Sequence, residues 1–440
     1  MGLGEGSLLC MREMPRYSMC VSLRTALCLL LALAVFIFEF HLRLRQEEDP
    51  QLAVRLRRLP HPLWSWDFAT QCCEVHPDGE KDTSYLHADL TNGSAVYVKV
   101  TQLTDFVDRF LLLPTTHRIS LVTGMDDFGP VELFSERSRL GNGLHAKLTL
   151  EQFLNDERLV VWFAQNYDAG SSPITGICTP VDLYDKPVLR KLQPLPLGID
   201  LHTWAEKRNM TSTKFKKLVA RQRLDLSSAA NASAEFLKKR TAMVVSFGCT
   251  FKQDQVRMQT RGVLCSLLNE FKDKNWIVPT ALKGEQGRRD FWHALQGNAF
   301  AIAPFGRGLD THRLWETLHL RSVPIVLSSP LDAMLESLFP VVIVKRWRDA
   351  FDHSFLLSHK RRLAEKFGLD KEGRLGADGL PLLLRQPWVD LVRSSIDSRV
   401  PVPSWYPALR AAVAYASLVH YPTPLPTRQP NLNATAAAPK

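Results

Sequence analysis

Short apolar runs alternate with amphipathic segments along the second half of the chain. The apolar runs have strand length and lie at 242–247, 276–278, 299–303, 323–327 and 341–344. Between them, the segments 257–271, 289–296, 311–320 and 331–338 space their apolar residues as on one face of a helix. Strands that alternate with helices at these lengths predict βαβ units and a parallel, doubly wound sheet.

The first half carries a weaker form of the same pattern. The run RISLVTG at 118–124 predicts a buried strand that ends at a glycine turn, and LVVWFAQ at 159–165 predicts another. The segment 194–200 is punctuated as a loop, and 205–239, rich in Lys, Arg, Ser and Ala, is typical of a helical or flexible connector. A first mixed α/β region is therefore expected from residue 64 to about 237.

One apolar run near the start predicts a membrane segment. Residues 25–38 (TALCLLLALAVFIF) hold no charge. The run is short for a bilayer, which needs about 20 residues, but tilt and thinner internal membranes accommodate it. The rival interpretation is a cleaved signal peptide, yet no small-x-small cleavage site follows. We expect a cytoplasmic tail at 1–22, a transmembrane signal anchor at 23–42 and a charged stem at 43–63, and at the other end a Pro- and Ala-rich tail at 401–440.

The direction of insertion rests on glycosylation sequons. Arginines flank the apolar run on both sides, so the positive-inside rule does not favour a luminal C-terminus. Asn-x-Ser/Thr sequons at Asn92, Asn209, Asn231 and Asn433 favour it, because glycan acceptors face the lumen. They predict a single-pass type II protein of the Golgi or endoplasmic reticulum membrane.

Composition and cysteine spacing limit the domain organisation and the kinds of binding site that the sequence allows. At 440 residues the chain is too long for one ordinary core, so two packed domains are expected. The net charge is +10, but the basic residues are scattered and only 358–362 (SHKRR) forms a compact run, which is typical of a solvated helix face rather than a nucleic-acid site. The cysteines at 72, 73, 178, 249 and 265 match no zinc pattern, and one disulfide of unassigned pairing is expected among them.

The densest candidate chemistry lies at 304–316 (PFGRGLDTHRLWE), between a predicted strand and a predicted helix. Gly306 and Gly308 let backbone approach a phosphate, and the start of the helix offers free N–H groups and a positive dipole end. Arg307 and Arg313 add charge for a diphosphate, and Glu316, one turn further on, is placed to accept hydrogen bonds from ribose hydroxyls. The alternative interpretation makes Asp310 a helix cap and pairs Arg313 with Glu316 at the surface.

These residues belong to a run that closely resembles the exostosin-like glycosyltransferases, GRGLDTHRLWETLHLRSVPIVLSSPLD at 306–332. LVTGMDDFGP at 121–130, WFAQN at 162–166 and PLGIDLHT at 196–203 are similar to further motifs of that family, in the same order. The resemblance implies a GT-B fold of two Rossmann-like domains, with an acceptor-side domain at 64–237 and a nucleotide-sugar-binding domain at 238–400. It also implies donor binding by Arg307, Gly308, Asp310, Arg313 and Glu316.

The resemblance further implies transfer of a sugar, with inversion, from a nucleotide-sugar, a UDP-sugar being favoured, to a glycan or glycoprotein acceptor. The transfer needs a base for the acceptor proton. Asp126 and Asp127, just after a strand and a glycine, are the candidates, and Asp200 with His202 is a second possibility. No Asp-x-Asp occurs in the chain, so neither a metal nor another cofactor is expected.

Two other classes remain as alternatives. Arg321-Ser322 stands where relatives usually have glycine before the Ile-Pro strand, which leaves open a catalytically silent luminal protein of the same fold that binds glycan or nucleotide. A Golgi sulfotransferase would share the anchor and the sequons, but its Gly- and Ser/Thr-rich phosphosulfate loop with lysine is absent from the sequence. The sequence does not predict an oligomeric state.

Overall fold

The computed structural model describes thirteen stretches of the chain, which are residues 59, 61–77, 82–87, 89–112, 116–125, 127, 129–134, 150–169, 187–201, 212–249, 256–280, 284–368 and 380–418. They belong to one compact unit that begins at Leu59. The predicted cytoplasmic tail, the signal anchor at 23–42 and most of the stem lie outside the described residues. Within the described stretches, no helix has the length and apolar character needed to cross a membrane.

A first parallel sheet contains strands in chain order, β1-β2-β3-β4. The strands are β1 (Ser94–Lys99), β2 (Ile119–Gly124), β3 (Leu159–Ala164) and β4 (Leu192–Pro194). The α-helices and 3-10 helices of this part are α3 (Ser65–Cys72), η1 (Ser84–His87), η2 (Val100–Gln102), α4 (Leu103–Leu112), α6 (Leu150–Asn155) and η3 (Pro187–Lys191). The predicted strands at 118–124 and 159–165 are confirmed. Among the described strands of this sheet the order never reverses, so the expected double winding is not found here.

One face of the first sheet is covered by the helices that connect its own strands. Phe153 of α6 packs edge-on against Trp162 of β3 and against Phe110 of α4. Trp162 donates a hydrogen bond from Nε1 to Thr123 Oγ1 on the neighbouring strand β2, at 2.9 Å. Crossovers between parallel strands are right-handed, so strands added in chain order place their helices on the same face and leave the other face open.

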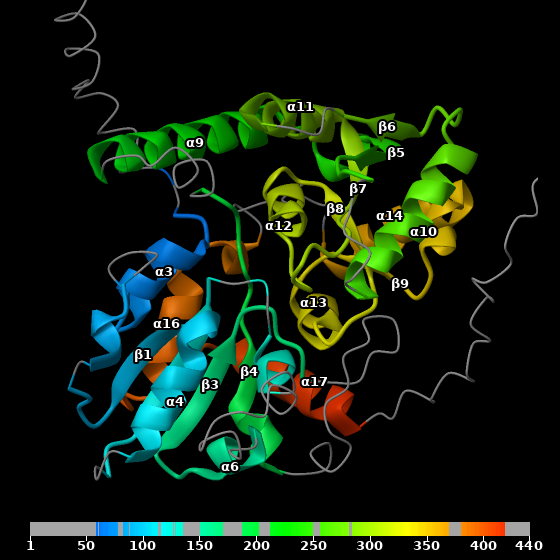
Figure 1. The fold of residues 1–440 in the computed structure, drawn as a ribbon. Coiled ribbons are helices and arrows are strands. Elements are labelled where there is room, and N and C mark those ends of the chain that lie inside the picture. Colours follow the sequence, from blue (N-terminus) through cyan, green and yellow to red (C-terminus); the bar gives the residue numbers. More distant parts are fainter. Residues whose placement is uncertain are drawn as a thin grey trace, which may run out of the picture. The chain divides into compact units, whose positions relative to one another are not determined.

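The open face is covered by helices from the C-terminal end of the chain. These are α16 (Gln386–Ser394) and α17 (Tyr406–Leu418), which follow the 3-10 helix η6 (Pro381–Leu383). Ser120 of β2 bonds Ser395, at 2.8 Å between hydroxyl oxygens, and Phe163 of β3 packs against Tyr406. Figure 1 draws α16 behind the strands of this sheet and α4 in front of them. The predicted boundary at residue 400 therefore does not separate two structural units, and the predicted tail begins with a packed helix.

The second sheet is parallel and doubly wound, as the alternation predicted, with order β6-β5-β7-β8-β9. Its strands are β5 (Arg240–Val245), β6 (Ile277–Pro279), β7 (Asn298–Ile302), β8 (Val323–Leu327) and β9 (Val342–Val344). Its helices are α9 (Ser212–Ala232), η4 (Phe236–Lys238), α10 (Val256–Glu270), α11 (Gly284–Gly297), α12 (His312–His319), α13 (Asp332–Leu338), η5 (Trp347–Phe351) and α14 (His353–Lys366). All five strands and the four helices predicted between 242 and 344 are confirmed, with boundaries that differ by a few residues.

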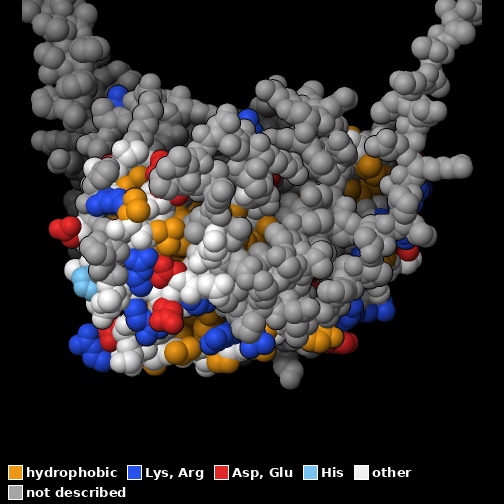
Figure 2. Space-filling model, turned by 60° about the horizontal axis from the view of Figure 1, so that its bottom comes forward, with side chains coloured by type: hydrophobic (Ala, Val, Ile, Leu, Met, Phe, Trp, Pro, Cys, Tyr) orange, Lys and Arg blue, Asp and Glu red, His pale blue; other side chains and the backbone are white. Residues whose placement is uncertain are grey.

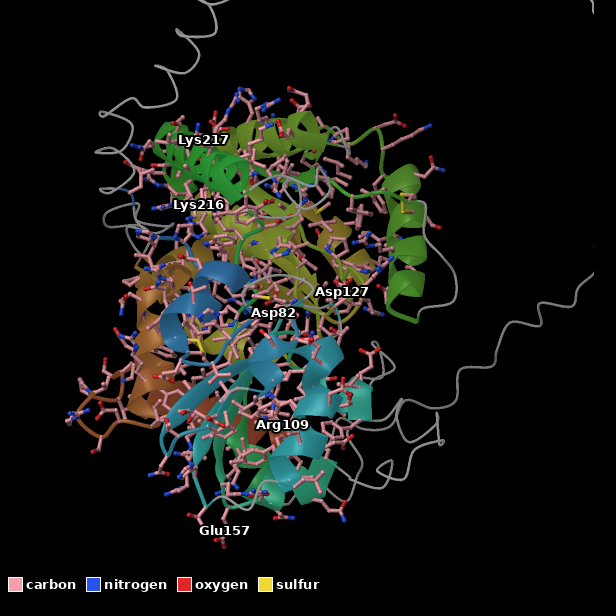
Figure 3. The ribbon with its side chains drawn as sticks, turned by 60° about the vertical axis from the view of Figure 1, so that its left-hand side comes forward. Asp82, Arg109, Asp127, Glu157, Lys216 and Lys217 are labelled. Atoms are coloured by element: carbon pink, nitrogen blue, oxygen red, sulfur yellow. A yellow bond between two sulfur atoms is a disulfide. The ribbon has the colours of Figure 1, made fainter. Side chains whose placement is uncertain are left out.

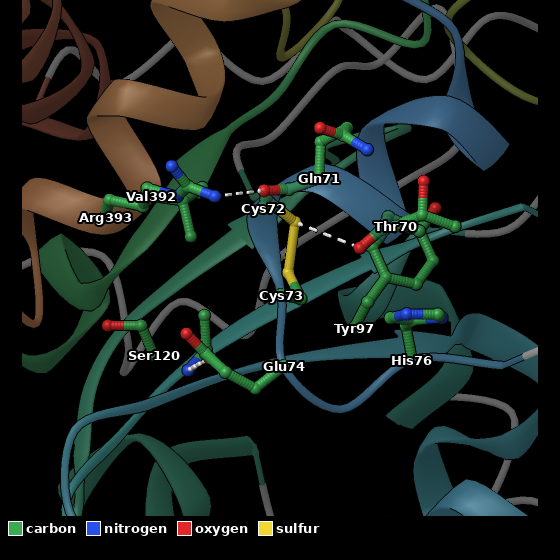
Figure 4. The surroundings of a disulfide bond; sticks show 12 residues. Thr70, Gln71, Cys72, Cys73, Glu74, His76, Tyr97, Ser120, Val392 and Arg393 are labelled. Atoms are coloured by element: carbon green, nitrogen blue, oxygen red, sulfur yellow. Dashed lines mark hydrogen bonds between the residues drawn. A yellow bond between two sulfur atoms is a disulfide. The ribbon is translucent and has the colours of Figure 1, made fainter.

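Two disulfides are present in the described part of the chain. Cys72 pairs with its neighbour Cys73 at the end of α3, where both side chains are buried (Figure 4). Cys249, four residues after β5, pairs with Cys265 on α10. The sequence predicted one disulfide without its pairing. Cys178, the remaining cysteine after the predicted anchor, lies outside the described residues. The second disulfide fixes α10 to the segment that follows β5.

Replacing both Cys249 and Cys265 by serine should lower the free energy of unfolding by about 3 kcal/mol. A crosslink across a loop of this length restricts the unfolded chain by roughly that amount. Urea unfolding followed by circular dichroism measures the difference, and the double variant avoids leaving a single reactive thiol. An unchanged unfolding midpoint would show that the pairing contributes nothing to stability.

Lys239 is a buried cation at the start of β5, with only 2% of its surface exposed. Its Nζ donates hydrogen bonds to the carbonyls of Leu295 and Leu320 and to Ser322 Oγ, which joins α11, the end of α12 and the start of β8. Burial, and then the charge of Arg321, lowers the pKa of Lys239 to about 7. Keeping the charged ammonium form of Lys239 in the folded protein therefore costs free energy.

This cost predicts a pH dependence of stability. Between pH 7 and about 10 the unfolded chain binds a proton at Lys239 that the folded chain does not, so stability rises with pH in this range, by at most about 1.4 kcal/mol per pH unit. Replacing Lys239 by methionine removes this slope, whereas the same replacement at exposed Lys238 keeps it. Urea unfolding of the three proteins at pH 7, 8 and 9 measures the slopes. Equal slopes for wild type and the Lys239 variant would contradict the assignment.

The described surface around the first sheet carries both positive and negative side chains. On the described part of the face drawn in Figure 2, Lys and Arg side chains lie among Asp, Glu and hydrophobic side chains rather than in one continuous patch. The sequon side chains of Asn92 and Asn231 are exposed, while Asn209 and Asn433 lie outside the described residues. Glycosylation at these positions stays a prediction.

Candidate functional site

The strand order of the second sheet reverses between β5 and β7. The crossover from β5 leads to β6 on one side, and the next crossover leads back past β5 to β7. In open parallel sheets, ligands bind outside the carboxyl ends of the strands at such a switch point. Here that edge is formed by Ser246 and Phe247 after β5 and by 303–306 after β7. The motif 304–316 therefore lies where the sequence predicted a ligand.

Two arginines from different helices meet at this edge. Arg261 of α10 donates from Nε to the carbonyl oxygen of Phe305 at 2.7 Å, and its guanidinium lies 5.9 Å from the ring centre of Phe247. Arg313 of α12 lies over the ring of Phe291, at 4.4 Å from its centre. Burial, and then the charge of Arg313, lowers the pKa of Arg261. The two guanidinium groups are therefore close enough to repel each other, which favours an anion between them.

Two hydroxyl groups beside the arginines lack hydrogen-bond partners among the described residues. Ser246, 4% exposed, has an unpaired buried Oγ, and Thr311 has an unpaired buried Oγ1. Thr311 is the N-cap residue of α12, yet its side chain makes no capping bond. Buried polar groups are nearly always paired in folded proteins, so unpaired ones at a sheet edge are typical of a site that a ligand or water completes.

Glu316 is buried between two arginines, with 2% of its side chain exposed. Its Oε2 lies 3.2 Å from an Nη atom of Arg313, as the three-residue spacing predicted, and its Oε1 lies 3.3 Å from Nε of Arg288 on α11. The remaining nitrogens of Arg288 bind Gln222 Oε1 of α9 at 2.7 Å and Asp200 Oδ2, after β4, at 3.1 Å. The expected surface ion pair is thus part of a buried network that joins four segments of the chain.

Asp310 and Gly308 connect the motif to the first sheet. The backbone N–H of Asp310 donates to Asn166 Oδ1, and Asp310 Oδ2 accepts from the backbone N–H of Leu197, both at 2.8 Å. Its other carboxylate oxygen accepts from Trp315 Nε1 at 2.8 Å, so Asp310 does not cap α12. Burial raises the pKa of Asp310 to about 6. A Cβ atom at Gly308 would lie 2.5 Å from Asn166 Oδ1, so close packing on Asn166 requires glycine here.

The motif WFAQN at 162–166 supplies side chains that hold together the carboxyl edge of the first sheet. Gln165 Oε1 accepts hydrogen bonds from Ser65, from Tyr97 and from the backbone N–H of Met125. A Cβ atom at Gly124 would lie 2.0 Å from the same oxygen, which accounts for the glycine that ends β2. Met125 and Asn166 both have positive φ, 61° and 50°, at the carboxyl ends of neighbouring strands. Strained backbone of this kind concentrates at functional sites.

The structure places the candidate base residues in different surroundings. Asp127 is half-exposed, and its Oδ2 lies 4.0 Å from an Nη atom of exposed Arg307, so two predicted site residues come together. Figure 3 labels Asp127, shortly after β2, and Glu157, just before β3, which mark opposite ends of the first sheet. Asp200 is held by Arg288 in the buried network, which leaves it unsuited to act as a base in this arrangement. Asp126 and His202 lie outside the described residues.

Sequence reasoning missed Arg261, Arg288, Ser246 and Asn166. Arg261 and Arg288 each occupy a polar position of an amphipathic helix, where a basic residue is ordinarily exposed. Asn166 was quoted only as part of a motif. The sequence did indicate the position of Ser246, which directly follows the predicted first strand of the second sheet, where side chains reach the ligand edge.

In the described stretches, no three His, Cys, Asp or Glu side chains gather in a way that could hold a metal ion. The expectation that the reaction needs neither metal nor other cofactor stays a prediction.

Comparison with known proteins gives little further information. No protein-family model matches the chain, and no curated protein matches it. Among solved structures, the wall teichoic acid polymerase TagF is similar over 70% of this chain and 90% of its own, at 10% identity and a TM-score of 0.21. A similarity at that level carries no argument about activity. The resemblance to exostosin-like glycosyltransferases therefore rests on the sequence motifs alone.

Proposed function

We propose that this protein is a glycosyltransferase whose nucleotide-sugar donor binds at the carboxyl edge of the second sheet. The observation that carries the proposal is the convergence of Arg261 and Arg313 at the switch point, beside the uncapped start of α12. A donor diphosphate carries the negative charge that such a pair attracts. The unpaired hydroxyl of Ser246 adds a hydrogen-bonding group directly after β5.

The proposed reaction is an in-line displacement. An acceptor hydroxyl forms a bond to the anomeric carbon, the bond from that carbon to the diphosphate oxygen breaks, and the configuration inverts. Negative charge grows on the leaving nucleoside diphosphate, where two arginines and free helix N–H groups stabilise it. The acceptor proton passes to a carboxylate on the other side of the sugar.

Asp127 is the described candidate for this carboxylate. It comes from the end of β2, whereas the arginine pair belongs to the second sheet. Its ion pair with Arg307 spans these two parts at 4.0 Å. We propose that Arg307 turns to the diphosphate when the donor binds, which frees Asp127 to accept the proton. Asp126 stays the other candidate for the base, and Gly308 and Asp310 support donor binding by shaping the loop rather than by touching phosphate.

The identity of the substrates is proposed from the sequence. A UDP-sugar donor, with Glu316 near the ribose, and a glycan or glycoprotein acceptor follow from the exostosin resemblance. Placement in the Golgi or endoplasmic reticulum membrane, through the segment 23–42, follows from the apolar run and the sequons.

One observation favours a second candidate, a catalytically silent luminal protein that binds glycan or nucleotide. Glu316, Arg307 and Asp127 are already paired with protein groups, and Asp310 has both carboxylate oxygens engaged. Such a protein would bind a ligand at the same edge but would leave the donor intact.

A thermal-shift screen of residues 60–440, secreted from a eukaryotic host, tests donor binding. UDP, GDP and their common sugars are titrated, since a ligand of the folded state raises the melting temperature by mass action. We expect a rise with one nucleoside diphosphate and its sugars. A well-folded sample that responds to none of them contradicts the proposal. Release of free nucleotide from the sugar that binds, with an acceptor mixture present, then separates an enzyme from the silent protein.

A further inference from the structure

A cavity of about 260 Å³ lies away from the candidate donor site, beside the amino end of β8. Its walls come from α9, the end of α12, the short turn before β8 and the segments at Leu59, Pro62 and Leu384, and its polar lining residues are Arg223, Ser227, Asn231, His319 and Arg321. Parallel strands begin at the edge opposite the one where they end, so this cavity and the Arg261–Arg313 pair lie at opposite edges of the second sheet. The cavity is smaller than the roughly 300–1,000 Å³ of pockets for drug-sized ligands.

Positive charge predominates around this cavity. The described residues that line it include two arginines and no carboxylate. Asp67 acts on the charge of Arg223 from nearby and also binds Arg385, and Arg223 itself donates from an Nη atom to the carbonyl oxygen of Leu59 at 3.2 Å. Burial lowers the pKa of Arg223, which reflects the cost of holding its charge there. An anion bound beside the guanidinium would add to the groups that stabilise its charge.

The backbone of Arg321 gives a second, independent indication. Arg321 follows the last turn of α12 with φ of 59°, the left-handed conformation in which helices usually place glycine. For a side chain with a Cβ this conformation is unfavourable. The sequence places arginine, one of the longest side chains, at a position suited to glycine, and that side chain lines the cavity. Strain retained at one residue favours a role for its side chain.

We propose that this cavity binds a small oxyanion, either a free ion or the sulfate or carboxylate group of an acidic sugar, with Arg223 and Arg321 as its ligands. The planar guanidinium binds such oxyanions through paired N–H donors. The hydroxyl of Ser227 on α9 supplies a neutral donor. The proposal is independent of the donor site, because none of its residues belongs to that site.

Thermal shift with sodium sulfate tests the site, against sodium chloride at equal ionic strength. The Arg313→Ala variant is the parent, so that sulfate at the donor edge does not contribute. We expect a rise in melting temperature that grows with the logarithm of the sulfate concentration, of about 2 °C at ten times the dissociation constant. Adding Arg321→Gly should abolish this rise above the chloride control. Because glycine suits the left-handed conformation, that variant should melt in chloride no lower than its parent, so loss of response is not loss of folding.

Two further ligands identify the source of the oxyanion. Glucuronate, with neutral glucose as its control, reports a sugar-borne carboxylate if its rise in melting temperature begins at lower concentration than that of sulfate, and a free ion is indicated by the reverse order. Both results support the site, provided that Arg321→Gly abolishes them. The proposal is overturned if Arg321→Gly responds to sulfate as its parent does, if the parent shows no rise above the chloride control, or if glucose matches glucuronate.

Discussion

Replacing Arg313 by alanine is expected to weaken the binding of the donor nucleoside diphosphate by about 10- to 100-fold. A hydrogen bond to a charged group contributes about 1.5–3 kcal/mol, which corresponds to this range. Arg261→Ala should have an effect of similar size, because both guanidinium groups reach the same edge of the second sheet. Isothermal titration with the nucleotide that responds in the screen measures both affinities.

Arg399→Ala is the matched control for these variants. The side chain of Arg399 is 89% exposed and pairs only with nearby Asp397 in the described part of the chain, so its loss should leave the affinity unchanged. Urea unfolding checks that the Arg313 variant remains folded, since Glu316 keeps Arg288 as its partner. If Arg313→Ala and Arg261→Ala bind nucleotide as tightly as Arg399→Ala does, the diphosphate does not lie between these arginines.

Replacing Arg288 by methionine is expected to lower the free energy of unfolding by about 3–5 kcal/mol. The change removes the cation from a buried network and leaves Glu316, 2% exposed, and Asp200 with uncompensated charge. Breaking a buried ion pair on one side is costly because the remaining charge is not solvated. Urea unfolding at constant pH measures the loss.

The neighbouring residue supplies the control for this effect. Arg289 is 46% exposed and pairs with Glu285 on the same helix, so Arg289→Met should change stability by less than about 1 kcal/mol. Adding Glu316→Gln to Arg288→Met should restore part of the lost stability, because it removes the buried negative charge. Equal effects of the two arginine variants would mean that the network around Arg288 does not contribute to stability.

The second sheet was predictable because local pattern and burial agree there. Its strands are nearly continuous apolar runs, and the helices between them show clear amphipathic spacing. The strand β1 was missed, since SAVYVK mixes polar and apolar residues, although all six are buried in the fold. The covering of the first sheet by α16 and α17 was also missed, because it depends on packing between segments more than 200 residues apart.

The candidate site was predictable only in part. The pairing of Arg313 with Glu316 follows from helical spacing, and the structure confirms it. The spacing does not reveal that Arg288 approaches Glu316 from another helix, or that Arg261 meets Arg313. Asp310 illustrates the same limit, since local reasoning offered a cap or a ligand contact, whereas its carboxylate bonds Leu197, more than 100 residues away in the sequence. Long-range contacts of this kind decide what each side chain does.

The most direct test of the account is a crystal structure of residues 60–440 with bound UDP, or with GDP if the screen selects it. The account predicts that the diphosphate lies within hydrogen-bond distance of the guanidinium groups of Arg261 and Arg313, at the start of α12. A diphosphate bound elsewhere, with Arg261 and Arg313 making no contact to it, would contradict the central claim.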